Sequence, residues 1–205
     1  MKPELTEVVK EVIEEARAVE DMEAKFGRSL SADEDDVRRF ILTRTAVWGR
    51  IPLVAEIKEA FARLPGEEVD AVLRALDEVD VIHLAEDGVS VAAAYPFSGP
   101  ETPHLVTPYA GDYRPVYAMC AVDALGIPFM LGCDVAIHSR CGHCDDAVDL
   151  RVEGGEITSL EPASAVVWFD LEPHPCAAAS CCPNTNFFAS AEHHAAGQEG
   201  RPPRR

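Results

Sequence analysis

A long apolar run extends from Val116 to Cys133, with the sequence VYAMCAVDALGIPFMLGC. It is nearly long enough for a membrane-spanning helix, but Asp123 lies inside it and Gly126-Ile127-Pro128 interrupts it. A carboxylate and a helix-breaking segment both disfavour a lone helix in lipid. We therefore expect this run to be buried core, with a short helix over Val116–Leu125.

Composition and charge limit the classes of partner. The chain has 205 residues, 47% of them hydrophobic, which is enough for a packed core in one domain or two small ones. It carries 36 acidic side chains against 18 Lys and Arg, a formal net charge of -18. Phosphate recognition needs clustered basic side chains, so we expect no nucleic-acid partner. The start, Met1-Lys2-Pro3-Glu4, has no apolar leader. We therefore expect a cytoplasmic protein with no membrane partner.

The first 95 residues show helices followed by a hairpin. Apolar residues recur at helical spacing over 4–26, over 31–49, after Pro52 and again after Glu67. Two short apolar segments, 79–84 and 89–94, flank Asp87-Gly88, a pair preferred in tight turns. This order predicts a winged-helix-like domain.

The would-be recognition helix of that domain is acidic. Between Glu67 and Asp80, Arg74 is the single basic residue. Such a face repels a nucleic-acid duplex. We therefore interpret the winged-helix-like part as a packing or lid module.

The rest of the chain is richer in strands. Residues 96–115 contain many Pro, Gly and Tyr and are typical of a linker. Strand-like runs follow at Val135–His138, Ala147–Val152, Ile157–Leu160 and Ala165–Leu171, with a Gly154-Gly155 turn between the second and third. We therefore expect an α+β protein with a helical winged-helix-like domain (1–95), a linker (96–115), a mixed sheet and helix core (116–192) and a disordered tail (193–205).

The cysteines are confined to this second half, where all seven fall between Cys120 and Cys182. In a reducing compartment an odd number of thiols indicates metal or catalytic chemistry before disulfides. No Lys occurs after Lys58, and the chain contains no phosphate-binding glycine motif and no G-x-S-x-G elbow. Sulfur combined with a carboxylate is the chemistry that remains.

One such combination is Cys120 with Asp123. If both lie in one helix, their spacing of three places them on the same face. Partial burial raises the pKa of a carboxyl group, so Asp123 could hold and deliver a proton near neutral pH. The alternative is a helix-capping Asp beside an inert core cysteine.

Two further sulfur sites leave alternatives open. The adjacent pair Cys181-Cys182 is either two buried thiols or one ligand with its neighbour. The segment Cys141-Gly142-His143-Cys144 is a single C-x-x-C with His138 upstream. A zinc site there would need further ligands, which the sequence offers as Cys133, Cys176 or the Cys181-Cys182 pair.

Three ordered segments together resemble the organomercurial (alkylmercury) lyase family. They are Tyr117–Pro128, then Ser139-Arg140-Cys141, then Ser180-Cys181-Cys182 followed by Phe187-Phe188-Ala189-Ser190. The similarity covers about Tyr95 to Ser190, and the helices and hairpin before it also resemble that family's N-terminal part.

The resemblance implies an enzyme that cleaves the carbon–mercury bond of R-Hg-X, releasing R-H and retaining Hg(II). By position, Cys120 and Cys181 would bind mercury, Asp123 would carry the proton, and Cys141 would be structural; Cys182 is the alternative member of its pair. No tightly bound cofactor is implied, because thiolates suit a soft ion such as Hg(II). External thiols or a mercuric reductase would accept the ion.

An apolar pocket formed by Met119, Phe129, Trp168 and Phe187 would suit the alkyl or aryl part of the substrate. The alternative is that these residues are plain core. A different class of function also fits the cysteines. The chain could be a soft-metal-binding or metal-responsive protein of the same fold without lyase turnover, built on Cys141, Cys144 and neighbouring thiols.

Overall fold

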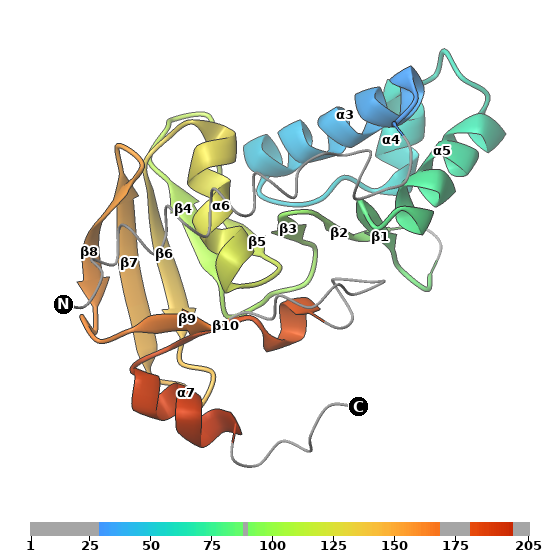
Figure 1. Ribbon diagram of the computed structural model, residues 1–205. Helices are drawn as coiled ribbons and strands as arrows, with labels where there is room; N and C mark the ends of the chain where they lie inside the picture. Colours follow the sequence, from blue (N-terminus) through green and yellow to red (C-terminus); the bar gives the residue numbers. More distant parts are fainter. Residues whose placement is uncertain (1–28, 88–89, 169–180, 199–205) are drawn as a thin grey trace.

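The structure is a computed structural model that describes residues 29–87, 90–168 and 181–198. It combines helices with antiparallel sheet, as expected of an α+β protein (Figure 1). The helix expected over 4–26 lies outside the described residues, as do Cys176 and the end of the strand expected over Ala165–Leu171.

Three helices lie at one end of the molecule: α3 (Ala32–Trp48), α4 (Val54–Ala60) and α5 (Gly66–Glu78). A capping box begins α3, because the Ser31 hydroxyl accepts from the Glu34 N–H (3.3 Å) and the Ser31 N–H donates to the Glu34 carboxylate (2.7 Å). Gly49 ends the helix at a positive φ of 72°. The predicted helices at these positions are confirmed.

These helices share a core with the first hairpin. Strands β1 (Ile82–Leu84) and β2 (Val91–Ala94) pair antiparallel, which confirms the predicted hairpin with shorter strands. Apolar side chains from all five elements meet in one buried cluster, including Val37, Ile41, Ile57, Val69, Leu73, Leu76, Ile82 and Val91. Hydrophobic burial therefore holds the helical end on the hairpin.

The hairpin is one edge of an eight-stranded antiparallel sheet, in the order β1-β2-β3-β5-β4-β6-β7-β8. The other strands are β3 (Phe97–Ser98), β4 (Leu105–Pro108), β5 (Val116–Ala118), β6 (Val135–Arg140), β7 (Ala147–Glu153) and β8 (Glu156–Glu161). The predicted strands that correspond to β6, β7 and β8 are confirmed.

The region expected to be a linker, 96–115, contributes β3 and β4 to the middle of this sheet. Phe97 and Val106 are fully buried. The abundant Pro and Gly of this region hid these two short strands in the sequence. One sheet therefore runs through both halves of the chain (Figure 1).

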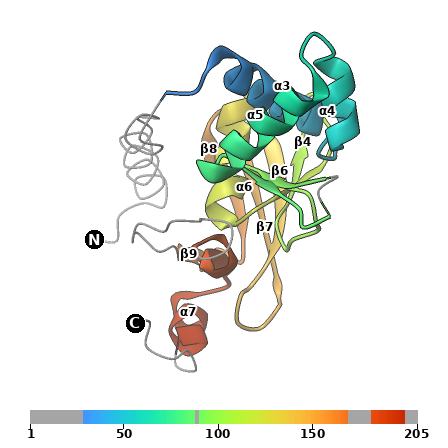
Figure 2. The ribbon, with the colours of Figure 1, turned by 90° about the vertical axis from the view of Figure 1, so that its right-hand side faces the viewer.

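The apolar run divides into a strand and a helix. Residues Val116–Ala118 form β5, between β3 and β4, so the helix expected over Val116–Leu125 is wrong in its first residues. The helix α6 is Ala121–Leu131, and it contacts β4 and β5 (Figure 2). Ala121, Ala124 and Ile127 are fully buried, which confirms a core role for this face. None of the described helices is both long and apolar enough to cross a bilayer.

The last described part of the chain adds a small sheet and a helix. Strands β9 (Val166–Trp168) and β10 (Asn186–Phe188) pair antiparallel, and α7 (Ala191–Gln198) contacts both (Figure 1). The His194 ring stacks on Trp168, with 5.6 Å between ring centroids, and meets Phe188 edge-on at 5.2 Å. These contacts hold a helix in a segment that we expected to fray from His193 onward.

Candidate functional site

Cys120 lies where β5 gives way to α6 and is the N-cap of that helix. Its thiol donates to Asp123 Oδ2 (2.9 Å), and its Sγ accepts from the Asp123 N–H (3.4 Å). Cap geometry, rather than a shared helix face, therefore brings Cys120 and Asp123 together. The sequence placed these two residues in one helix, whereas Cys120 has an extended backbone just before it.

A second sulfur reaches the same point from a distant part of the chain. Cys182 begins the short 3-10 helix η2 (Cys182–Asn184), and its thiol lies 3.7 Å from Asp123 Oδ2. The ligand atoms of Cys120, Asp123 and Cys182 all lie within 4.8 Å of one another. Both cysteines are buried. Two thiols and a carboxyl group therefore converge in a largely dry site.

Thr185 holds the cysteine pair against α6, and nothing in the sequence marked it for this role. Its carbonyl oxygen accepts from the Ala121 N–H at the first turn of α6 (3.1 Å). Its hydroxyl donates to the Cys181 carbonyl (3.2 Å), and its N–H donates to the Cys182 carbonyl (3.1 Å). Because Thr185 is itself buried, these bonds fix the segment relative to Cys120.

Cys181, the predicted second mercury ligand, is not part of the three-residue group. Its Sγ lies 3.6 Å from the Thr185 hydroxyl, and the residue is half-buried. The structure thus brings Cys182 to Cys120 and Asp123. Sequence could not choose between adjacent thiols, because the η2 turn decides which side chain faces α6.

The protonation state of Cys120 follows from its surroundings. The hydrogen bond with Cys182, burial, and the nearby Asp123 carboxylate raise the pKa of the Cys120 thiol well above its ordinary value. The Cys120 sulfur therefore stays protonated at neutral pH in the resting site. A soft metal ion that replaces this proton releases it beside Asp123.

The four residues expected to form an apolar pocket lie in different environments. Phe187 is buried, with its ring centroid 5.8 Å from that of His104. Trp168 stacks on His194, and Phe129 is 39% exposed on α6. Met119 is half-buried and directly precedes Cys120.

A second group of ligand-type residues consists of Cys141, Cys144 and His193, whose ligand atoms also lie within 4.8 Å of one another. Burial opposes ionisation of Cys141, but N–H groups of Ala189, Cys144 and His143 together with the His193 ring lower its pKa to about 6. The predicted C-x-x-C thus acquires a histidine partner. That partner is not His138, which pairs with Asp149 (2.7 Å).

Comparison with known proteins shows which family the chain belongs to. A sequence model of MerB, the alkylmercury lyase family, matches residues 97–204, more than half of the chain. The chain belongs to the alkylmercury lyase family. The matched region includes both groups of ligand-type residues and confirms the resemblance carried by the three ordered segments.

Individual members of the alkylmercury lyase family are moderately similar. The alkylmercury lyase of Staphylococcus epidermidis is 34% identical over 140 residues, which is 68% of this chain and 61% of that protein. The alkylmercury lyase of Bacillus cereus is 33% identical over 109 residues, 53% of this chain and 48% of that protein. The chain therefore spans about half to three-fifths of the length of these relatives.

A solved structure supports the fold. The crystal structure of the mercury-bound form of MerB2 superposes with a TM-score of 0.73 at 22% identity, covering 92% of this chain and 87% of that one. The mixed helical and antiparallel-sheet architecture is thus shared with that protein.

Proposed function

We propose that the protein is an organomercurial lyase that cleaves the carbon–mercury bond of R-Hg-X. The observation that carries this proposal is the convergence of Cys120, Asp123 and Cys182 within 4.8 Å, in a chain of the alkylmercury lyase family. Two thiols supply the soft ligands that mercury prefers, and the carboxyl group is near enough to move protons between sulfur and carbon.

In the first step, mercury exchanges its ligand X for the Cys120 sulfur. The Hg–X bond breaks and an Hg–S bond forms, while the thiol proton leaves with X by way of Asp123, which already accepts the S–H hydrogen bond at 2.9 Å. Asp123 therefore ends this step as a carboxylate. Because the pKa of Cys120 is raised, the strong Hg–S bond is what displaces the proton. The product is a protein-bound R-Hg-S species.

In the second step, another thiolate binds mercury and carbon departs. The Cys182 proton passes to Asp123, whose carboxylate oxygen is 3.7 Å away. Two sulfur donors raise electron density on mercury and weaken its bond to carbon. Protonated Asp123 then delivers its proton to carbon as that bond breaks, so R-H leaves and Hg(II) remains on two thiolates.

The second sulfur comes from the Cys181-Cys182 pair. The family resemblance points to Cys181, whereas the short distance to Asp123 favours Cys182. We assign the second mercury-binding sulfur to Cys182. The Cys181 sulfur lies beside the site, at the Thr185 hydroxyl. Serine variants of each cysteine separate the two assignments.

The remaining partners follow from this chemistry. The reaction needs no tightly bound cofactor, because sulfur and carboxylate supply ligands and protons. We propose that the chain works in the cytoplasm and releases Hg(II) to external thiols or to a mercuric reductase. Ligand exchange with free thiols is the chemically direct way to remove an ion from two thiolates.

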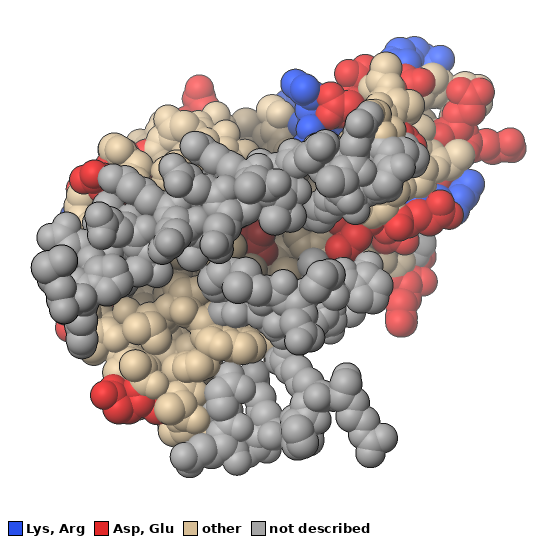
Figure 3. Space-filling view, viewed as in Figure 1, with Lys and Arg blue, Asp and Glu red and all other residues tan. Residues whose placement is uncertain are grey.

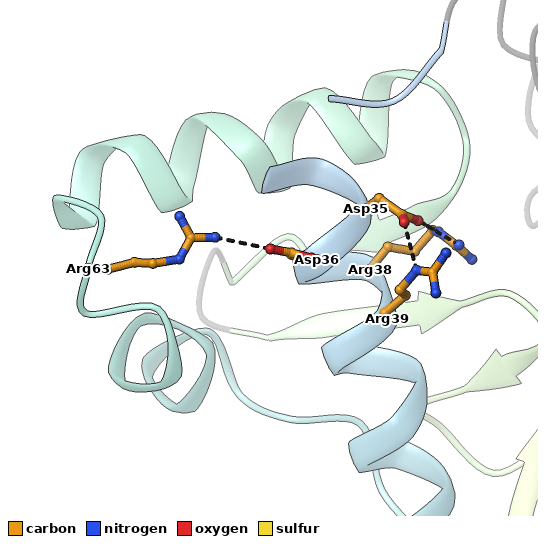
Figure 4. Close-up of polar contacts among 5 residues, drawn as sticks. All are labelled: Asp35, Asp36, Arg38, Arg39 and Arg63. Atoms are coloured by element: carbon orange, nitrogen blue, oxygen red, sulfur yellow. Dashed lines mark hydrogen bonds and ion pairs between the residues drawn. The ribbon is translucent and has the colours of Figure 1, made fainter. Parts of the chain in front are cut away.

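We propose that α3, α4, α5 and the β1–β2 hairpin, which follow the order of a winged helix, form a packing module and do not bind nucleic acid. Acidic side chains gather over this end of the molecule (Figure 3). On α3, Arg38 and Arg39 both contact Asp35, at 2.8 and 2.6 Å, and Arg63 contacts Asp36 at 3.3 Å (Figure 4). These arginines are paired with carboxylates, which disfavours phosphate binding.

Turnover of phenylmercuric acetate tests the lyase proposal. We expect the protein with excess thiol to release benzene faster than thiol alone, and Cys120→Ser to release it at the thiol-only rate. Cys133→Ser is the matched control, because Cys133 is half-buried and belongs to neither ligand group. Tight mercurial binding without benzene would instead favour the soft-metal-binding alternative.

A further inference from the structure

Cys141, Cys144 and His193 form a second cluster that the proposed carbon–mercury chemistry does not use. The two cysteines lie in the loop between β6 and β7, and His193 lies in the first turn of α7. Elements far apart in the sequence thus bring two sulfurs and one imidazole nitrogen together. We propose that this cluster is a structural zinc site that fastens α7 to the β6–β7 loop.

The distances match zinc coordination. His193 Nδ1 lies 3.6 Å from Cys141 Sγ and 3.3 Å from Cys144 Sγ. Bonds of about 2.3 Å to sulfur and about 2.1 Å to nitrogen, at the tetrahedral angle, separate these two kinds of ligand by about 3.6 Å. Both nitrogen–sulfur distances therefore lie within a few tenths of an ångström of the separation that a shared zinc ion would impose.

Hydrogen bonding alone explains poorly why one His193 nitrogen contacts two sulfurs. One imidazole nitrogen has either one proton or one lone pair, so it cannot form good hydrogen bonds with two sulfurs at once. A cation satisfies all three atoms together. An imidazole with two thiolates suits zinc, and a two-residue spacer between cysteines is typical of structural zinc sites.

The loop is shaped around the sulfurs by its backbone. The Cys141 N–H donates to the Asp146 carbonyl (2.8 Å), and the Asp145 N–H donates to the Cys141 carbonyl (3.0 Å). The Asp146 carboxylate accepts from the Cys144 thiol at 3.2 Å, which places negative charge next to the three ligands. Water or this carboxylate would be the fourth ligand of the tetrahedral zinc ion.

The same loop also supports β10, the strand that follows Cys182. The Gly142 N–H donates to the Phe187 carbonyl in β10 (2.8 Å). An added Cβ at Gly142 would lie only 3.2 Å from Asn186 and from the Phe188 ring, so loop and strand are in close contact. Zinc would therefore hold β10 and α7 on the main sheet.

Metal content of the full chain tests the site. The protein is produced with zinc and without mercury, and purified under reducing conditions without chelator. We expect stoichiometric zinc, lost in Cys144→Ser and in His193→Gln but retained in the matched controls Cys133→Ser and His138→Gln. Cys144 is exposed and His193 half-buried, so both substitutions spare the buried Cys141.

Two further measurements make the outcome decisive. Cobalt(II) bound in place of zinc should give the visible spectrum of a tetrahedral thiolate site, and a chelator should lower Tm in the wild type but not in Cys144→Ser. Zinc absent from the wild type, or zinc retained by both site variants, overturns the proposal. Loss of zinc in Cys120→Ser instead, or a Cys141–Cys144 disulfide in the purified protein, overturns it equally.

Discussion

Cys120 caps the helix that carries Asp123, with its sulfur 2.9 Å from the Asp123 carboxylate and 3.4 Å from the Asp123 backbone nitrogen. The contact that stabilises the start of α6 is therefore also the one that joins the proposed mercury ligand to the proposed proton carrier. Because a helix cap has restricted geometry, the two groups are positioned before substrate arrives.

Replacing Asp123 should separate binding from cleavage. Asp123→Asn keeps the size of the side chain but removes the acid, so we expect phenylmercury to bind while benzene release falls by about 100-fold or more. Mass spectrometry of the protein and gas chromatography of benzene measure the two steps. Asp149→Asn, at a half-exposed carboxylate on β7 that pairs with His138, is the control. An unchanged rate in Asp123→Asn would exclude this carboxyl group as the proton carrier.

The two adjacent cysteines should differ in effect. Cys182→Ser removes the sulfur nearest Asp123 and should lower the rate of benzene release by at least about 100-fold, while Cys181→Ser should retain most activity. Mercury stoichiometry after one turnover, measured without added thiol, checks the same assignment. The reverse order of effects would place the second ligand at Cys181, as the family resemblance suggests.

Thr185 should matter for stability and for the site together. Thr185→Val keeps the shape but removes a buried hydroxyl that donates to the Cys181 carbonyl, so we expect a loss of about 1 kcal/mol in the free energy of unfolding. Urea denaturation measures this cost. Turnover should also slow, because the segment that carries Cys182 is then less firmly held. Thr158→Val, at an exposed hydroxyl on β8, is the control.

His104 should make the protein sensitive to acid. Burial lowers the pKa of His104 from 6.5 to about 4, although a hydrogen bond with Asn186 opposes this. Between these values the unfolded chain binds more protons than the folded one, so stability falls as the pH drops from about 6.5 to about 4. The His104 contribution amounts to about 3 kcal/mol.

The comparison for this pH effect is His104→Gln, which cannot titrate. We expect the wild type to lose more stability than the variant between pH 7 and pH 4, as measured by urea denaturation at each pH. Ser139, whose hydroxyl lies 2.8 Å from His104 Nδ1, stays in place in both proteins. Parallel pH profiles would show that His104 does not titrate in this range.

Two glycines should respond oppositely to alanine. At Gly142 a Cβ would lie 3.2 Å from Asn186 and the Phe188 ring, so Gly142→Ala should lower Tm. At Gly126, inside α6, a Cβ meets nothing within 4 Å, so Gly126→Ala should stabilise the helix by about 0.5–1 kcal/mol. Thermal unfolding of both variants checks this. Equal effects would contradict the close contact between Gly142 and β10.

Local sequence patterns were sufficient for much of the fold. The capping box at Ser31, the αL glycine at Gly49 and the Gly154-Gly155 turn act through their immediate neighbours, so their residue types identify them. Strands β6 and β7 alternate buried with more exposed side chains over several residues. By contrast, β3 and β5 have only two and three residues, too few for a period to be visible.

The sequence by itself determined which residue types are available for chemistry: three ordered segments that contain cysteine, one carboxylate three residues after Cys120, and a net charge of -18 that disfavours phosphate. Only the tertiary structure decided which atoms meet. The hydrogen bond that the Ala121 N–H donates to the Thr185 carbonyl, together with the bond within η2, turns Cys182 toward Asp123. Packing of α7 brings His193 to Cys141 and Cys144. The reason is physical. The type of a residue determines what its side chain can bind. The direction in which that side chain points depends on contacts between segments that are distant in the chain.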